Sequence, residues 1–238
     1  MSFTPFIGTS GFSYKEWKGN FYPEKIAAKD MLAHYATQLA SVEINNTFYR
    51  MPKKDVLESW AEQVPAGFRF VIKASRRITH MRRLKDTDEA TGYLLDAVGA
   101  LGDRLGAILF QLPPNFRLEL DRLRDFLALL PEGTPAAFEF RHPDWFVDEV
   151  YSMLRERNCA FAYVDDDDSE KDVALVGTAD WGYARLRRPG YSTEELTAIA
   201  QEMRKQEWKR AYVFFKHEDA GVGPALARQF CDILEGME

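Results

Sequence analysis

The stretch Phe68–Lys73, with the sequence FRFVIK, alternates large apolar side chains with a second row made of Arg69, Val71 and Lys73. A period of two residues is typical of a β-strand, because successive side chains point to opposite faces of a sheet. We expect the apolar row to pack against helices and the second row to face the interior of a closed sheet. This strand then brings Lys73 to the carboxyl end of that interior.

Similar short apolar runs recur along the chain and alternate with segments of helical period, which is the pattern of repeated strand–helix units. The eight expected strands begin near Phe6, Ser41, Phe68, Leu105, Ala136, Ala160, Tyr183 and Ala211. The expected helices cover Met31–Ala40, Lys53–Gln63, Thr87–Leu101, Leu118–Leu130, Phe146–Arg157, Thr193–Lys205 and Pro224–Leu234. This order predicts an α/β fold, a closed eight-stranded parallel (β/α)8 TIM barrel with some irregular units, as a single domain over residues 1–238.

The composition limits the classes of protein to which the chain can belong. Hydrophobic residues make up 46% of the 238 residues and charged residues 29%, proportions typical of a globular protein. A formal net charge of −6 argues against a protein that coats nucleic acid or an anionic membrane through its overall field. No apolar run approaches the roughly 20 residues that span a bilayer. We expect a cytoplasmic protein with no membrane partner, in which Cys159 and Cys231 are both reduced.

The alternation within strands places polar side chains on the inward rows at or near the carboxyl ends of five strands. They are Glu43, Asn45, Lys73, Gln111, Glu139, Arg141 and Arg185. Barrel enzymes keep their active sites at this end, so these residues predict a ligand site at the mouth of the barrel. The alternative is that ion pairs close the mouth without binding anything, with Glu43 meeting Lys73 and Arg141 meeting Asp165.

The loops that follow these strands are rich in aromatic residues. Tyr14 and Trp17 follow the first strand, Tyr49 follows the second and Trp145 follows the fifth. Aromatic walls around a few charged groups suit a ligand with planar or apolar faces, such as a sugar or a base. Each ring taken alone is better explained by packing, so the cluster as a whole carries the prediction that these four residues bind a ligand.

Several motifs occur in a fixed order along nearly the whole chain. They include IGTSGFSY at 7–14, VEINNTFYR at 42–50, FVIKAS at 70–75, LFQLPP at 109–114 and FEFRH at 138–142. In these motifs the chain resembles the YecE-like family, a domain of unknown function. The resemblance implies a TIM-barrel fold and brings no established substrate.

Two places at the expected mouth depart from the pattern common in that family. Lys216 and His217 stand where a pair of asparagines is common, and Arg187 and Arg188 stand where His-Gly is common. These departures predict a ligand preference of this chain's own. Because Lys216, His217 and also His142 lie near strand ends, we include them among the expected ligand-binding residues.

Glu139 is the candidate for general acid/base catalysis, because it shares a face with Arg141 among aromatic loops that can shift its pKa. Glu43 and Asp165 are the other candidate catalytic carboxyls. The alternative role of Glu139 is to hold Arg141 in place. Glycoside hydrolysis fits less well, since barrel glycosidases commonly place their two carboxyls after strands four and seven, where this chain has an amide and an arginine.

The charges around the mouth favour an anionic ligand over a metal ion. His142, Asp165 and His217 fall near strand ends, but the lysines and arginines on the same rim repel a divalent cation. We therefore predict no metal and no cofactor, and we expect Arg141 and Arg185 to bind a phosphate or carboxylate group.

Lys73 also fits the role of an anion binder. A desolvated lysine is instead a nucleophile that forms Schiff bases, but Glu43 on the adjacent strand is expected to keep the amine of Lys73 charged. The sequence therefore favours binding over covalent chemistry at this residue.

Two functions stay open on the sequence. The first is a small-molecule enzyme, a hydrolase or another acid/base enzyme, acting on an anionic substrate such as a sugar phosphate or a nucleotide. The second is a noncatalytic protein that binds a metabolite or nucleic acid through the same polar ring. A basic cluster beyond the third strand would assist contact with a nucleic-acid backbone; it consists of Arg76, Arg77, Arg82 and Arg83.

Overall fold

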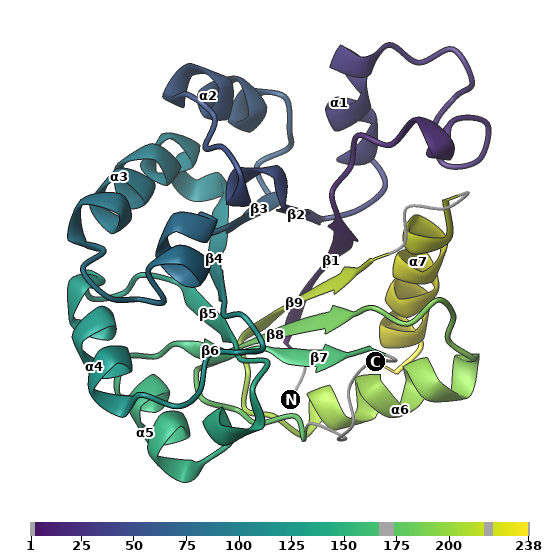
Figure 1. Cartoon of the computed structure of the whole chain (residues 1–238). Helices are drawn as coiled ribbons and strands as arrows, with labels where there is room; N and C mark the ends of the chain where they lie inside the picture. The colour runs from purple at the N-terminus through teal and green to yellow at the C-terminus, as the bar shows by residue number, and fades with distance from the viewer. Residues whose placement is uncertain (1–2, 167–173, 217–220, 238) are drawn as a thin grey trace.

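A computed structural model describes residues 3–166, 174–216 and 221–237 as strands wrapped by helices (Figure 1). The strands are β1 Thr4–Ser10, β2 Ser41–Ile44, β3 Arg69–Lys73, β4 Leu105–Gln111, β5 Ala136–Glu139, β6 Ala160–Phe161, β7 Tyr163–Asp165, β8 Trp181–Leu186 and β9 Arg210–Phe215. They form one parallel sheet with the order β6-β5-β4-β3-β2-β1-β9-β8-β7. The α/β fold and the parallel arrangement are therefore as predicted.

Among the described residues, seven α-helices lie on the outside of the sheet, each near its predicted position (Figure 1). They are α1 Met31–Tyr35, α2 Lys54–Glu62, α3 Asp88–Val98, α4 Leu120–Leu129, α5 Asp148–Glu156, α6 Thr193–Arg204 and α7 Val222–Glu235. The shorter turns are η1 Lys15–Trp17, η2 Ala28–Asp30, η3 Asn46–Phe48, η4 Arg77–Met81, η5 Gly99–Arg104 and η6 Pro143–Trp145, of which η4 is a π-helix. Helix α1 ends earlier than expected, where the hydroxyl of Thr37 donates to the carbonyl of His34 at 2.7 Å.

The prediction of eight strands needs a correction, because the described residues contain nine. Ala162 divides the run that was expected to form the sixth strand into β6 and β7. Strand β6 pairs with β5 on one side, whereas β7 pairs with β8 on the other. The two ends of the sheet therefore meet at this one-residue break, and the sheet is a nearly closed, TIM-barrel-like structure.

The inward rows predicted from the alternation are confirmed by how the strands pack. Val71, Leu109 and Ala137 belong to a buried cluster that also includes Tyr183 of β8 and Phe214 of β9, which is the filling of the barrel. The opposite rows belong to the larger core between the sheet and the helices, with members such as Phe70, Ile108 and Phe138. Because apolar side chains fill the barrel, polar groups of the inward rows are left at its ends.

Two further observations concern the whole described chain. Cys159 and Cys231 are both free thiols. No helix within residues 3–166, 174–216 and 221–237 combines the length and the apolar character needed to cross a membrane.

Candidate functional site

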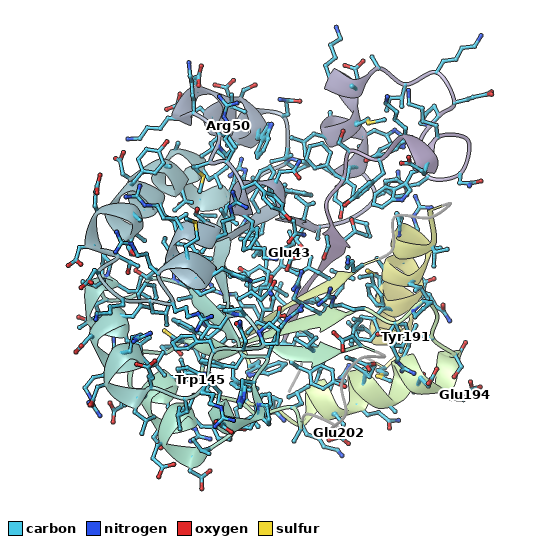
Figure 2. The ribbon with its side chains drawn as sticks, in the orientation of Figure 1. Glu43, Arg50, Trp145, Tyr191, Glu194 and Glu202 are labelled. Carbon is cyan, nitrogen blue, oxygen red and sulfur yellow. The ribbon has the colours of Figure 1, made fainter. Side chains whose placement is uncertain are left out.

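The carboxyl ends of five strands bring charged and amide side chains to one end of the barrel interior. We call them the mouth cluster: Glu43 from β2, Lys73 from β3, Gln111 from β4, Glu139 from β5 and Arg185 from β8. Figure 2 shows Glu43 near the middle of the molecule, inside the ring of helices. Glu43, Glu139 and Arg185 are buried above the apolar filling of the barrel, whereas Lys73 is partly exposed.

Arg185 joins two carboxylates of the mouth cluster. Its Nη2 donates to Oε1 of Glu43 at 2.8 Å, and its Nη1 donates to Oε2 of Glu139 at 2.6 Å. Arg185 is 3% exposed and both glutamates are fully buried, so none of the three charges is stable here without the others. Burial acts to lower the pKa of Arg185, but Glu43 and Glu139 raise it above its usual value, and the guanidinium stays charged.

Three further donors fix the carboxylate of Glu43. Ser10 and Asn45 donate to Oε1 at 2.8 and 3.0 Å, and the hydroxyl of Tyr183 donates to Oε2 at 2.5 Å. Burial alone raises the pKa of Glu43, but Arg185, Tyr183 and Ser10 outweigh it and hold that pKa below its usual value. Glu43 is therefore ionised and held in one orientation.

Glu139 bonds to two arginines. Besides Arg185, it accepts from Nε of Arg141 at 2.9 Å, which is the contact expected if Glu139 holds Arg141 in place. Burial opposes ionisation, but Arg185 and Arg141 lower the pKa of Glu139 to about 2. The side chain of Arg141 is 30% exposed, and its Nη groups have no hydrogen-bond partner among the described residues, so it has donors left for a ligand.

Lys73 has no hydrogen bond or ion pair from its Nζ to any residue that the structure describes. Its Nζ lies 4.6 Å from the centroid of the Phe48 ring. Burial, together with the charge of Arg185, lowers the pKa of Lys73 to about 8, although Glu43 and Glu139 act in the opposite direction. Lys73 therefore titrates close to neutral pH.

Two polar groups of the mouth cluster make no hydrogen bond to the described residues, and one of them is a fully buried atom. Gln111, which lies beside Glu139 in the sheet register, is 7% exposed, and its amide makes no hydrogen bond within the described chain. The Nε of Arg185 is likewise buried and unpartnered among the described residues. Buried polar groups normally find partners, so unpaired groups at a barrel mouth point to a ligand or to water.

The loop after β3 adds an imidazole to the same end of the barrel. His80 lies in the π-helix η4, packs edge-on against Phe48 at 4.8 Å and shares a 2.9 Å hydrogen bond with the hydroxyl of Thr79. Burial and the charges of Lys73 and Arg141 lower the pKa of His80. His80 is therefore a neutral group next to Lys73, on the kind of irregular turn that is frequent at functional sites.

Neither ion pair of the simple structural alternative occurs among residues 3–166, 174–216 and 221–237. Glu43 pairs with Arg185 instead of Lys73, and Arg141 pairs with Glu139 instead of Asp165. Asp165 accepts from Nε of Arg188 at 3.0 Å, away from the mouth cluster.

The structure does not bring the predicted tryptophans to the mouth. Trp145 is fully buried among the helices, where its ring stacks on Phe140 and its indole nitrogen donates to the carbonyl of Phe116 at 2.7 Å (Figure 2). Trp17 is 1% exposed and packs against Tyr14, whose hydroxyl donates to the carbonyl of Ser10 at 2.7 Å. These rings support the loops around the site.

The remaining predicted ligand-binding residues lie around the rim or outside the described residues. Tyr49 is 71% exposed beside the loop after β3. His142 accepts from the backbone of Asp144 at 3.2 Å and so caps η6. Lys216 is exposed at the end of β9, and His217 lies outside the described residues.

No group of three or more His, Cys, Asp or Glu side chains suited to a metal ion occurs in the described part of the chain. The two carboxylates of the mouth cluster are already neutralised by arginines, which leaves no donor set for a divalent cation there.

Three residues that lie at the site were not predicted from the sequence. Tyr183 and Ser10 bond to Glu43, and His80 lies next to Lys73. The position of Tyr183, two residues before Arg185 on the same inward row, is a signal that the sequence does contain. Ser10 lies in the motif at 7–14, at the end of a strand, and His80 lies in the loop after β3, where the alternation does not predict side-chain directions.

A family model described as "Protein of unknown function DUF72" matches residues 6–238. The UPF0759 protein YecE of Escherichia coli strain K12 is 36% identical over 116 residues, which are 48% of this chain and 43% of YecE. The aligned part is thus less than half the length of that relative.

Solved structures agree on the fold. A DUF72 family protein from Thermotoga maritima is 27% identical, with a TM-score of 0.85 over 98% of this chain and 99% of that one. A methyltransferase from Methanosarcina mazei is 11% identical, with a TM-score of 0.54 over 100% of this chain and 95% of that one, which is a likeness of fold alone.

Proposed function

The chain belongs to the DUF72 family of proteins of unknown function, and from this premise we propose that its barrel mouth binds a small anionic molecule and acts on it as an enzyme. The ligand class is a phosphorylated or carboxylated compound of sugar or nucleotide type. Arg141, Lys73 and Gln111 supply the contacts, while Glu43 and Glu139 hold Arg185 rigidly beneath them.

The balance of charge in the mouth is the observation that carries this proposal. Two buried carboxylates, Glu43 and Glu139, face three cations, Lys73, Arg141 and Arg185, and each carboxylate is already bonded to an arginine. The surplus positive charge, with the unpartnered amide of Gln111, suits an anion with hydrogen-bonding oxygens. A cationic ligand would find no free acid among these residues.

Glu139 keeps its predicted role as acid or base within this proposal. Because its pKa lies at about 2, it would enter the reaction as a carboxylate, and a substrate that displaces Arg141 would leave one oxygen of Glu139 free to accept a proton. The Glu139→Gln variant tests the role: we expect turnover to be lost while ligand affinity stays within a few-fold. Unchanged turnover would remove Glu139 from the chemistry.

The anion site is tested by calorimetric titration with inorganic phosphate and with sugar phosphates. We expect Arg141→Ala to weaken binding about tenfold or more, since a charged hydrogen bond contributes roughly 1.5–3 kcal/mol. Arg210→Ala is the matched control, because Arg210 is exposed at the first residue of β9, at the opposite end of the barrel. Equal affinities for both variants and the unaltered protein would contradict the proposed site.

A second function is favoured by the surface beside the mouth. The guanidinium of Arg76 lies 5.7 Å from the ring centroid of exposed Tyr49, and Arg82 is exposed nearby on the same loop. Aromatic rings flanked by arginines suit single-stranded nucleic acid. Binding to an oligonucleotide should then fall steeply with salt and weaken in the Arg76→Glu, Arg82→Glu double variant. A flat salt response would exclude this function.

A further inference from the structure

Lys73 differs from the other charged members of the mouth cluster because no carboxylate within the described residues forms an ion pair with it, and its Nζ contacts the ring of Phe48 instead. Glu43, the acid that the sequence predicts as the partner of Lys73, accepts hydrogen bonds instead from Ser10, Asn45, Tyr183 and Arg185. The direct ion pair that was expected to keep Lys73 charged is therefore absent, and Glu43 and Glu139 act on its amine only without direct contact.

Burial and the neighbouring arginines make the ammonium of Lys73 easier to deprotonate than that of an exposed lysine. Its register partner in β4 is the fully buried Leu109. The ring of Phe48, 4.6 Å from its Nζ, makes a cation–π contact with the charged form, which compensates for burial less than a paired carboxylate would. The positive charges of Arg185 and Arg141 disfavour a third cation beside them, and burial acts in the same direction. The residue is only half-buried, so a small molecule that enters the mouth can reach the amine.

We propose that Lys73 forms an imine with the carbonyl carbon of an anionic substrate whose acidic group is bound by Arg141. This inference rests on the proposed function, to which it adds a substrate class: small aldehydes or ketones that carry a carboxylate or a phosphate. The sequence favours anion binding over imine formation at Lys73 because it predicts an ion pair with Glu43, and the structure has Glu43 paired with Arg185 instead.

The reaction balances without any further reagent. The ammonium of Lys73 gives up one proton, and the lone pair of Nζ attacks the carbonyl carbon while the carbonyl oxygen takes that proton. The nitrogen of the adduct then loses a second proton, which passes to the hydroxyl, so that water leaves and the protonated imine remains. Overall, the ammonium and the carbonyl compound give the protonated imine and one water. His80, neutral and packed on the same Phe48 ring, is the group placed to carry the proton between these steps.

Borohydride trapping on the full chain tests the proposal. The protein is incubated with pyruvate, glyoxylate or dihydroxyacetone phosphate and reduced, and its peptides are mapped by mass spectrometry. We expect the peptide with Lys73 to gain the mass of the carbonyl compound less one oxygen atom. At pH 7.5 this label should exceed that on exposed Lys54 by at least about tenfold, and its formation should rise with pH around the pKa of about 8. Uncharged dihydroxyacetone should label Lys73 far less.

Two variants and one competitor separate the outcomes. Lys73→Arg keeps the positive charge and should lose the label, whereas Lys54→Arg should keep the label on Lys73. In the unaltered protein, excess inorganic phosphate should protect Lys73, which tests the site even if Lys73→Arg fails to fold. Phosphate binding without any label on Lys73 would overturn the imine and leave the anion site standing. Neither binding nor label would overturn both, and a label spread evenly over surface lysines would overturn the imine.

Discussion

Each end of the barrel interior contains an arginine, and the two arginines have different partners. At the amino-terminal end, Arg69 lies 5.4 Å from the ring of Phe6, and its Nη1 donates to the carbonyls of Ala66 and Phe68 at 2.9 Å. At the carboxyl end, Arg185 is sealed from solvent and bonds to two buried carboxylates. The difference teaches that burial, more than residue type, decides whether an arginine needs acid partners.

The amino-terminal end is otherwise aromatic. Phe6 stacks on Tyr212 at 5.2 Å, and Trp181 packs edge-on against the same ring at 5.8 Å. This end contributes apolar burial, whereas the carboxyl end contains the fixed charges and the unpartnered groups. The two ends of the barrel interior therefore differ in character, one aromatic and apolar, the other charged.

The largest effect expected from this contrast comes from removing Arg185. Arg185→Ala leaves two buried carboxylates without their shared cation and should lower the free energy of unfolding by about 3–5 kcal/mol. Arg69→Ala should lower it by less than about 1 kcal/mol, because no buried acid depends on Arg69. Urea unfolding followed by circular dichroism measures both. Equal losses for the two variants would remove the distinction between the ends.

Acid should weaken the carboxyl end in a defined pH window. The pKa of Glu139 is about 2 in the folded chain against an ordinary 4.5, so its ionisation stabilises the fold above pH 4.5. That contribution, on the order of 3 kcal/mol, is lost as the pH falls from 4.5 through about 2, because the unfolded chain binds the proton first. In Glu139→Gln the slope of unfolding free energy against pH should become shallower across this window. The same slope in both proteins would contradict the assignment.

A smaller effect is expected at the aromatic end. A Cβ added to Gly106 would lie 2.8 Å from Cε1 of Tyr212, so Gly106→Ala should destabilise the protein by about 1–3 kcal/mol. Gly92→Ala is the control, since a Cβ there meets nothing within 4 Å inside α3, and it should be neutral or stabilising. Phosphate affinity should not change in either variant. A change in affinity for Gly106→Ala would show that the two ends are coupled.

Much of this contrast was predictable because strand periodicity is a local property. The alternation in FRFVIK was enough to place Lys73 inward at the carboxyl end, and the same rule placed Glu43, Glu139 and Arg185. The family resemblance predicted the barrel, and the helices followed from their apolar period. The break at Ala162 carries no such signal, since a single unpaired residue leaves the apolar run intact.

Which charged side chains pair with one another could not be predicted from the sequence. The alternation of side chains places Glu43 and Lys73 on the same side of the sheet, but it does not predict that Arg185 extends across the barrel and binds the carboxylate of Glu43. The prediction that the loop tryptophans bind a ligand does not hold for a related reason. Trp145 and Trp17 follow strands, as ligand-binding rings do, but their large apolar side chains are buried under the loops.

The bridge made by Arg185 also sets an order of events during synthesis of the chain. Arg185 follows Glu139 by 46 residues and Glu43 by 142 residues, so both acids leave the ribosome before their common partner exists. Until β8 has been made, Glu43 lacks its arginine and Glu139 has Arg141 alone, so burying the two acids together would leave a charge inside the barrel without a partner. We therefore expect the nascent chain to keep its mouth hydrated while most of its strands are already available. The mouth would then close only when the last third of the polypeptide has been made.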